Sequence, residues 1–265
     1  MTDDEWRKGI LNSAIRRPVL EIFSLEKFKG KSQEILRTNL ITEGFDLFIA
    51  VGPEALSFVS TEIQNSKIKI LFTMVLNPEE IVKNSDELSG IPLKIPIRTQ
   101  IQEIKRLLPC LKRPGLLYDP LYNSLFFKEA GENGVSASLN IIPLEVSSKK
   151  DIPQVLQKYW SKIDSLWIIP DRTVVSESII QYIIKEAVLN KIPVIGYNRF
   201  FYESGAALAF VFDYKKIGRE TAKLALKSIA EKRSLKEDPE FKTLTNSRII
   251  QKLNIKKECR GESAE

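Results

Sequence analysis

The sequence predicts an α/β protein in which parallel strands are covered by helices on both faces. Short apolar runs rich in Val, Ile and Phe alternate with longer stretches of helical period, which is typical of successive strand and helix units. Most of these runs are apolar throughout, as expected of strands buried on both faces. The runs expected to form strands are, in order, 19–23, 45–51, 69–76, 91–97, 114–119, 138–146, 165–171, 192–198 and 207–213.

Length and composition limit the classes of function. At roughly 150 residues per domain, 265 residues fit two modest domains better than one large one. The chain has no histidine, which excludes Ser-His-Asp and Cys-His catalytic sets and zinc sites with histidine ligands. The net charge of +6 is spread along the chain, so no nucleic-acid partner is expected. Cys110 and Cys259 form no CxxC pair, which leaves their redox state open.

The expected helices follow the strands directly. Proline at the first helical position and Asn, Ser or Asp at the N-cap are the usual signals of a helix start. In open α/β sheets, ligands bind outside the carboxyl ends of the strands, where the connecting loops lie. Start signals in such loops stand at Gly52-Pro53, Asn77-Pro78, Asn123-Ser124 and Asp213.

Two loops in the first part of the chain offer candidate ligand contacts, each beside a simpler alternative. Gly52 would let a ligand approach the backbone, and Glu54 could pair with an ammonium group, although a tight turn explains Gly52-Pro53 equally well. Asn77 could contact a ligand or cap the next helix. Neither loop has the spacing of a phosphate-binding loop, so a nucleotide site is not expected.

The segment 118–124 combines aromatic and polar side chains, as small-molecule pockets do. It contains Tyr118 and Tyr122 with Asn123 and Ser124. A helix cap with packed tyrosines is the alternative interpretation of this segment.

A second polar loop follows the buried run 165–171. Asp171 could accept the amino group of a ligand, or it could form an Asx turn that caps the next helix. We favour the ligand role because a carboxylate at this edge would face a cleft. Thr173 lies in the same loop.

The segment 196–222 carries further candidates. Tyr202 lies between two expected strands, Gly205 is expected to supply an unusual backbone turn, and Asp213 is expected to cap the following helix. No nucleophile, paired catalytic carboxylates or phosphate loop can be assembled from the sequence, so an enzyme is the least favoured class of function.

Taken together, these segments resemble the ABC-transporter substrate-binding proteins of the tryptophan/tyrosine-binding type, which have a periplasmic-binding-protein class I fold. The resemblance runs from about Phe45 to Ile255. It rests on FDLFIAVGPEAL, ILFTMVLNP, LLPCLKRPGLLYDPLYNS, LWIIPDRTVVSES, IPVIGYNRFFYESGAALAFVFDYKKIGRETA and LTNSRIIQKLNI, in this order.

The resemblance implies two Rossmann-like lobes with parallel sheets flanked by helices, joined by a hinge and closing on a small ligand in the cleft between them. The N-terminal lobe would comprise residues 1–97 and 214–235, and the C-terminal lobe residues 98–213 and 236–265. No cofactor and no metal are implied. The ligand contacts that the resemblance implies are Gly52, Glu54, Asn77, Tyr118, Asn123, Ser124, Asp171, Thr173, Tyr202 and Asp213.

The implied function is that of the solute-binding component of an ABC importer, with a small polar or zwitterionic ligand such as an amino acid, and with ABC permease and ATPase subunits as partners. Many family members have Gly-Thr in place of Gly52-Pro53 and Asp-Pro in place of Asn77-Pro78, so a hydroxyl and a carboxylate of the usual site are absent here.

The alternative to a transport function is a cytoplasmic ligand-sensing domain of the repressor type without its DNA-binding part, because sugar-responsive repressors share the fold.

The start of the chain departs from the family. Members are exported or lipid-anchored, and their first lobe opens with a central strand. Here the first residues resemble no secretory signal, and an amphipathic helical pattern precedes the first expected strand, with Trp6, Ile10, Leu11, Ala14 and Ile15 on one face. We therefore expect the natural chain to extend upstream by a signal of about 15–30 residues and a first strand of about 5–6. With that signal the protein would be periplasmic or membrane-anchored outside the cytoplasm, and as the chain stands it would be cytoplasmic.

Overall fold

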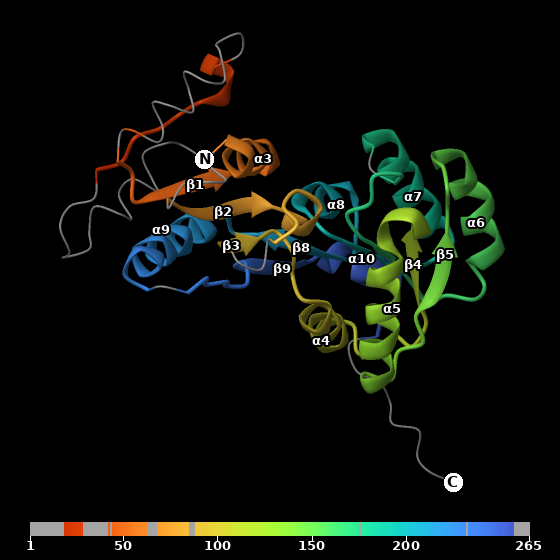
Figure 1. Ribbon diagram of the computed structural model, residues 1–265. Helices are drawn as coiled ribbons and strands as arrows, with labels where there is room; N and C mark the ends of the chain where they lie inside the picture. Colours follow the sequence, from red (N-terminus) through yellow and green to blue (C-terminus); the bar gives the residue numbers. More distant parts are fainter. Residues whose placement is uncertain are drawn as a thin grey trace. The chain divides into compact units, whose positions relative to one another are not determined.

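The chain divides into two compact units, each built from two separate stretches of sequence. Unit 1 comprises Met1–Ile95 and Phe212–Glu240, and unit 2 comprises Pro96–Val211 and Phe241–Glu265. Figure 1 shows the computed structural model. The structure describes residues 19–28, 42, 44–62, 68–84, 88–174, 176–231 and 233–256.

Unit 1 contains a sheet of three parallel strands in the order β1-β2-β3. Successive side chains of a strand point to opposite faces, so Leu71 packs against helix α9 while Phe72 packs on the side of α3 with Leu56. Figure 1 shows these two helices on opposite sides of the sheet. The elements of unit 1 are η1 (Leu25–Phe28), β1 (Leu47–Val51), α3 (Pro53–Glu62), β2 (Lys69–Val75), η2 (Pro78–Glu80), β3 (Ser89–Pro92) and α9 (Tyr214–Ala230).

Unit 2 contains a sheet of six strands in the order β5-β4-β6-β7-β8-β9, of which the pairs from β5 through β8 are parallel. The strands are β4 (Pro114–Tyr118), β5 (Ile142–Glu145), β6 (Ser165–Ile168), β7 (Val194–Gly196), β8 (Leu208–Phe212) and β9 (Phe241–Thr245). The helices are α4 (Ile97–Leu107), α5 (Pro120–Ser136), η4 (Lys149–Asp151), α6 (Ile152–Tyr159), α7 (Glu177–Leu189), α8 (Arg199–Ser204) and α10 (Ser247–Lys252).

The core of unit 2 lies on both faces of its sheet. On one face, Leu117 and Ile168 pack with apolar residues of α6 and α7, among them Leu156 and Ile183. On the other face, the fully buried ring of Trp167 meets Phe126 of α5 edge to face, with ring centroids 5.7 Å apart. The predicted class, α/β with parallel sheets flanked by helices, is therefore confirmed.

One expected strand is wrong, a second is wrong in part, and one observed strand was not expected. The run 19–23 is not a strand, and Val19 is 91% exposed, because no strand within the described ranges pairs with it. The run 91–97 is divided: β3 ends at Pro92, and α4 begins directly after Pro96. Strand β9 was not expected, because its sequence FKTLT follows a polar segment and contains one apolar residue between its threonines.

Two helix starts also differ from the expectation. Asn77 is followed by a single 3-10 turn, η2, in place of a longer helix. Helix α5 begins at Pro120 and not after Ser124, because Asp119 caps it and proline occupies its first position. The expected starts of α3 at Pro53 and of α9 after Asp213 are confirmed, as is the left-handed turn at Gly205, where φ is 111°.

One sequence expectation concerns residues that the structure leaves undescribed. The helical pattern of Trp6, Ile10, Leu11, Ala14 and Ile15 lies outside the described residues. In the part of the chain that is described, no helix has the length and apolar composition needed to cross a bilayer.

Two glycine substitutions test the packing of unit 2. A Cβ on Gly196 would stand 2.3 Å from Cβ of Phe201, whose ring is buried in the core, whereas a Cβ on Gly131 in α5 would meet nothing within 4 Å. We expect Gly196→Ala to lower the free energy of unfolding by about 1–3 kcal/mol and Gly131→Ala to raise it by about 0.5–1 kcal/mol. Urea unfolding followed by circular dichroism measures both. Equal effects of the two substitutions would contradict the packing described.

Candidate ligand-binding site

The candidate site lies at the carboxyl edge of the sheet of unit 2. Strands β4 and β6 are parallel neighbours, with Leu117 paired to Ile168. The loops that follow them therefore leave the sheet at the same edge and side by side. One loop leads into α5 through Asp119, and the other, residues 169–174, contains Asp171.

The carboxylate of Asp171 joins these two loops. Its Oδ2 accepts hydrogen bonds from the backbone N–H of Asp119 at 2.8 Å and from Nδ2 of Asn123 at 2.7 Å. Its Oδ1 accepts from the backbone N–H groups of Thr173 at 2.8 Å and Val174 at 3.3 Å. The residue is only 3% exposed. A buried carboxylate is stabilised when such donors replace its water, and these four bonds occupy its usual acceptor positions.

Asp119 is a second buried carboxylate of the same cluster, 5% exposed. Its Oδ1 accepts from the backbone N–H of Leu121 at 2.9 Å and so caps α5, and its Oδ2 accepts from the hydroxyl of Thr173 at 2.6 Å. Asp171 thus accepts from the backbone of Asp119, and Thr173 donates to its side chain. We call Asp119, Asn123, Asp171 and Thr173 the Asp171 cluster.

The backbone of α5 places Asn123 in this cluster. Asn123 departs from helical geometry, with φ −129° and ψ 21°, so the helix is kinked one turn after its start. The kink turns the amide group toward Asp171, where it donates the hydrogen bond described above. The neighbouring Leu121, Tyr122 and Leu125 are exposed at this end of the helix.

Two tyrosines near this edge have a raised pKa. Burial, together with the negative charge of Asp171, raises the pKa of Tyr197 to about 12. Burial and the hydrogen bond that the Tyr118 hydroxyl donates to Oε1 of Glu145, at 3.0 Å, raise the pKa of Tyr118 well above its usual value. Both hydroxyls therefore remain protonated at neutral pH.

The structure brings together three of the residues predicted from sequence in unit 2, namely Asn123, Asp171 and Thr173. The other three lie apart from the hydrogen bonds of the cluster. The ring of Tyr118 stacks on Phe127 and its hydroxyl faces Glu145, Ser124 is exposed, and Tyr202 of α8 packs against the apolar core.

The four predicted residues of unit 1 occupy ends of helices and strands. Gly52 has φ 93° and donates its N–H to the carbonyl of Thr73 at 2.9 Å, and Glu54 is exposed in the first turn of α3. Nδ2 of Asn77 donates to Oε1 of Glu80 at 2.7 Å, and its side chain does not cap η2. Asp213 caps α9 by accepting from the N–H of Lys216 at 3.2 Å, as expected.

Sequence reasoning missed Asp119 and Tyr197 as members of this edge. The Asp119-Pro120 pair is itself a helix-start signal and could have identified the capping residue. Tyr197 directly follows a buried strand at the same edge, which was the criterion applied to Asp171.

Among the described residues, no group of three or more Asp, Glu and Cys side chains is arranged to hold a metal ion.

The two units with their parallel sheets between helices have the periplasmic-binding-protein class I fold. A family model described as "ABC transporter substrate binding protein" matches residues 21–259. The chain therefore belongs to the ABC-transporter substrate-binding protein family. The homologues are substrate-binding proteins and not enzymes.

The chain is also similar to individual substrate-binding and ligand-binding proteins. A tyrosine-binding protein of Clostridioides difficile is 26% identical over 191 residues, which are 69% of this chain and 54% of the relative, so the chain spans about half of that relative's length. The ligand-free, open structure of a substrate-binding protein with adhesive properties from Clostridium difficile has a TM-score of 0.71 and 19% identity, covering 98% of this chain and 92% of that one. An ABC domain from Streptococcus pneumonia in complex with L-Trp has a TM-score of 0.59 and 20% identity, covering 86% and 81%.

Removal of the Asp171 carboxylate is expected to destabilise unit 2. Asp171→Ala would leave the N–H groups of Asp119 and Thr173 and the amide of Asn123 without their acceptor, and we expect the free energy of unfolding to fall by about 3 kcal/mol. Urea unfolding measures the change. Asp164→Ala, which also removes an acceptor of two backbone N–H groups but at a half-buried position, is the control and should cost less. A smaller loss for Asp171→Ala than for the control would contradict the structural role of the carboxylate.

The raised pKa of Tyr197 predicts how stability changes in base. The folded protein keeps the phenolic proton up to about pH 12, whereas the unfolded chain releases it near pH 10. The stabilisation is therefore complete below pH 10 and is lost as the pH rises through 12. Tyr197→Phe should flatten the fall of unfolding free energy between pH 10 and 12, measured by urea unfolding at each pH. Tyr122→Phe, which removes an exposed hydroxyl, is the control, and an unchanged slope in Tyr197→Phe would contradict the assignment.

Proposed function

We propose that this protein is the solute-binding component of an ABC importer and that it binds an amino acid with an aromatic side chain at the Asp171 cluster. The observation that carries this proposal is the joining of two loops by Asp171 at the carboxyl edge of a parallel sheet. Ligands of open α/β folds bind at this edge. Membership of the substrate-binding family supports transport over the sensory alternative.

The charge of the cluster favours the ammonium end of a zwitterion. Asp119 and Asp171 place two carboxylates below the surface of the edge. The amide of Asn123 uses its Nδ2 on Asp171, and the hydroxyl of Thr173 uses its hydrogen on Asp119. Each of these side chains can then present an oxygen as an acceptor. Two acceptor oxygens backed by two negative charges suit an α-ammonium group, which carries three donors.

The neighbouring side chains favour an aromatic ligand with a carboxylate. The ring of Tyr122 is 49% exposed, and the guanidinium carbon of Arg172 lies 5.5 Å from its centroid. In our proposal Tyr122 stacks on the ligand's ring and Arg172 attracts its carboxylate. The names of two relatives, a tyrosine-binding protein and a domain in complex with L-Trp, support this class of ligand.

Binding in this proposal is completed by closure of the two units on the ligand. The chain passes from one unit to the other at Ile95–Pro96, Val211–Phe212 and Glu240–Phe241. Gly52, Glu54, Asn77 and Asp213 of unit 1 remain the predicted contacts on that side. Contacts from both units would shift the population toward the closed state. The closed protein would then deliver its ligand to ABC permease and ATPase subunits from outside the cytoplasm.

Calorimetric titration with a small panel tests the proposal. The panel consists of L-tryptophan, L-tyrosine, L-phenylalanine, L-leucine and indole-3-propionate, which has the ring and the carboxylate but no ammonium group. We expect at least one aromatic amino acid to bind, and to raise the unfolding temperature, while indole-3-propionate does not. Equal binding of indole-3-propionate would contradict the ammonium site, and no binding by any aromatic amino acid would contradict the ligand class.

Two substitutions locate the ligand. Asn123→Ala and Thr173→Val each remove an acceptor for the ammonium group, and we expect a loss of affinity of about 10- to 100-fold. Asn133→Ala, at a half-buried position of the same helix where the amide donates to the carbonyl of Glu129, is the matched control. Circular dichroism of each variant shows that it is folded at the temperature of the titration. Unchanged affinity in both site variants would place the ligand elsewhere.

A further inference from the structure

The strands of unit 2 begin at the edge of the sheet opposite to the Asp171 cluster. Backbone hydrogen bonds join the segments that enter neighbouring strands. The N–H of Asp164, before β6, donates to the carbonyl of Arg113, before β4, at 3.0 Å, and the N–H of Asn140, before β5, donates to the carbonyl of Lys112 at 2.8 Å. Helices α4, α5, α6 and α7 end at this edge, because each leads into one of the strands β4, β5, β6 and β7.

Exposed cationic side chains gather at this edge. They come before β4, β6 and β7, in the last turn of α6, and after α10 in a hollow shared with the segments before β4 and β7. Asp164 is the one acidic residue among the described residues that line the hollows of this edge. Its Oδ2 already accepts from the N–H groups of Lys112 at 2.7 Å and Arg113 at 2.8 Å. We call the six cations the basic edge: Lys112, Arg113, Lys158, Lys162, Lys191 and Lys256.

Two cations of the basic edge share one aromatic ring. Nζ of Lys158 lies 5.4 Å, and Nζ of Lys162 5.1 Å, from the ring centroid of Tyr159. The ring is half-buried and packs against the core of unit 2, so it is fixed in place. Two like charges held near one ring repel each other, and an anion beside them lowers that repulsion. The pair therefore favours an anionic partner.

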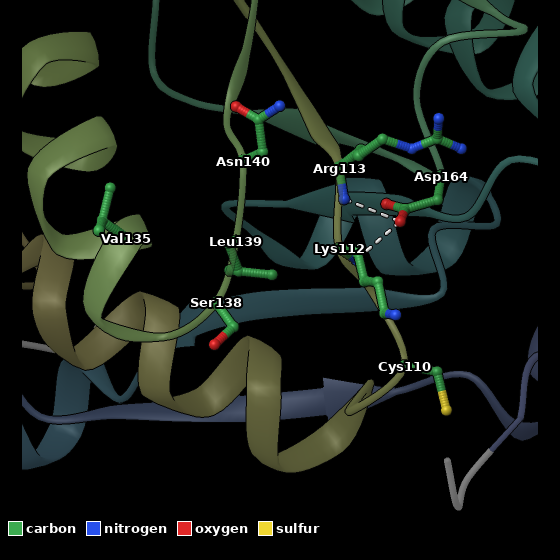
Figure 2. A pocket seen from close by; sticks show the side chains of 8 residues that line it. All are labelled: Cys110, Lys112, Arg113, Val135, Ser138, Leu139, Asn140 and Asp164. Atoms are coloured by element: carbon green, nitrogen blue, oxygen red, sulfur yellow. Dashed lines mark hydrogen bonds between the residues drawn. The ribbon is translucent and has the colours of Figure 1, made fainter. Parts of the chain in front are cut away.

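Two large aliphatic side chains are exposed beside these cations. Val135 in the last turn of α5 is 77% exposed, and Leu189, the last residue of α7, is 67% exposed. Leu189 comes two positions before Lys191, and Val135 lines a hollow of about 600 Å³ together with Lys112 and Arg113. Figure 2 shows Val135 on one side of this hollow and the two cations on the other. Cations beside exposed aliphatic side chains are typical of surfaces that lie at the interface of a bilayer.

The same hollow offers hydrogen-bond donors to a phosphate group. The hydroxyl of Ser138 and the amide of Asn140 line it together with Arg113, and a guanidinium can bind two phosphate oxygens at once. We propose that the basic edge docks unit 2 on the surface of a bilayer that contains anionic lipid. Lipid phosphates then lie at the cations, and Val135 and Leu189 lie at the level of the headgroups.

The side chains favour a bilayer over a nucleic acid. Surfaces that bind single-stranded nucleic acid use exposed rings on which bases stack. Here the ring of Tyr159 packs on the core, and the exposed apolar groups are aliphatic, which suits acyl chains. Docking at this edge directs the other end of the strands away from the bilayer. The proposal therefore does not rest on the proposed ligand site.

Co-sedimentation of the full chain with lipid vesicles tests the proposal. One set of vesicles contains equal parts of phosphatidylcholine and phosphatidylglycerol, and the other contains phosphatidylcholine alone. We expect binding to the first set only. It should weaken when the salt concentration rises from about 0.1 M to about 1 M, because the Debye length falls from about 10 Å to about 3 Å. Equal binding to both sets, or binding to neither, would overturn the proposal.

Two matched triple variants locate the contact. Each loses one arginine and two lysines, so their net charges are equal, and circular dichroism shows that each is folded. At about five-fold in affinity per basic residue near an anionic surface, the site variant should bind the vesicles about 100-fold more weakly. The control should lose no more than a few-fold, because its charges lie beyond the Debye length from the bilayer. Equal losses would overturn the proposal. The site variant combines Arg113→Gln, Lys162→Gln and Lys191→Gln, and the control combines Lys128→Gln, Lys185→Gln and Arg199→Gln, at exposed positions of α5, α7 and α8.

The exposed aliphatic side chains distinguish a bilayer from a soluble polyanion. Val135→Ser combined with Leu189→Ser should lower vesicle affinity about 10-fold and leave retention on a heparin column unchanged. Full vesicle affinity in this variant would overturn contact with a bilayer. Vesicle binding is measured without an amino acid, and amino-acid affinity should be the same with and without vesicles. A failure here is therefore distinguishable from a failure of the proposed function.

Discussion

The polar edge of unit 2 depends on the hydrogen bonds that the buried carboxylate of Asp171 accepts. A charged group this deeply buried is stable only when donors from the protein replace its water, and here three backbone N–H groups and the side-chain amide of Asn123 do so. Oδ2 of Asp171 binds residues that follow β4, and Oδ1 binds the backbone of the loop after β6, to which Asp171 itself belongs. Asn123 at the kink of α5 and the backbone of Thr173 are both bonded to this carboxylate.

The same interaction sets the chemistry of the edge. Asp171 and Asp119 are occupied by donors of the chain, so in the proposed complex they would act on the ligand through their charge, and direct contact would fall to Asn123 and Thr173. Charge that is neutralised only by dipoles of the protein attracts a cation more strongly than it would in water. Under the proposed function, this division of roles would make a small polar site both rigid and selective for an ammonium group.

Much of the fold could be predicted because strands buried on both faces are apolar throughout. The runs at 114–119 and 165–171 show this and correspond to β4 and β6. The run at 19–23 is apolar apart from Glu21 and pairs with no strand in the described part of the chain, whereas β9 lies beside β8 although its sequence FKTLT is not apolar throughout. Asn123, Asp171 and Thr173 could be found as polar residues after strands, but their pairing with Asp119 needs the strand order. That order, with β6 beside β4, is tertiary information that no local pattern contains.

A crystal structure of the amino-acid complex would test the central claim most directly. The account predicts that the α-nitrogen of the ligand lies about 3 Å from Oδ1 of Asn123 and from Oγ1 of Thr173, while all four hydrogen bonds to Asp171 are retained. A ligand whose nitrogen binds the Asp171 carboxylate directly, with Asn123 turned away, would contradict the account. So would a ligand bound at any other part of the chain.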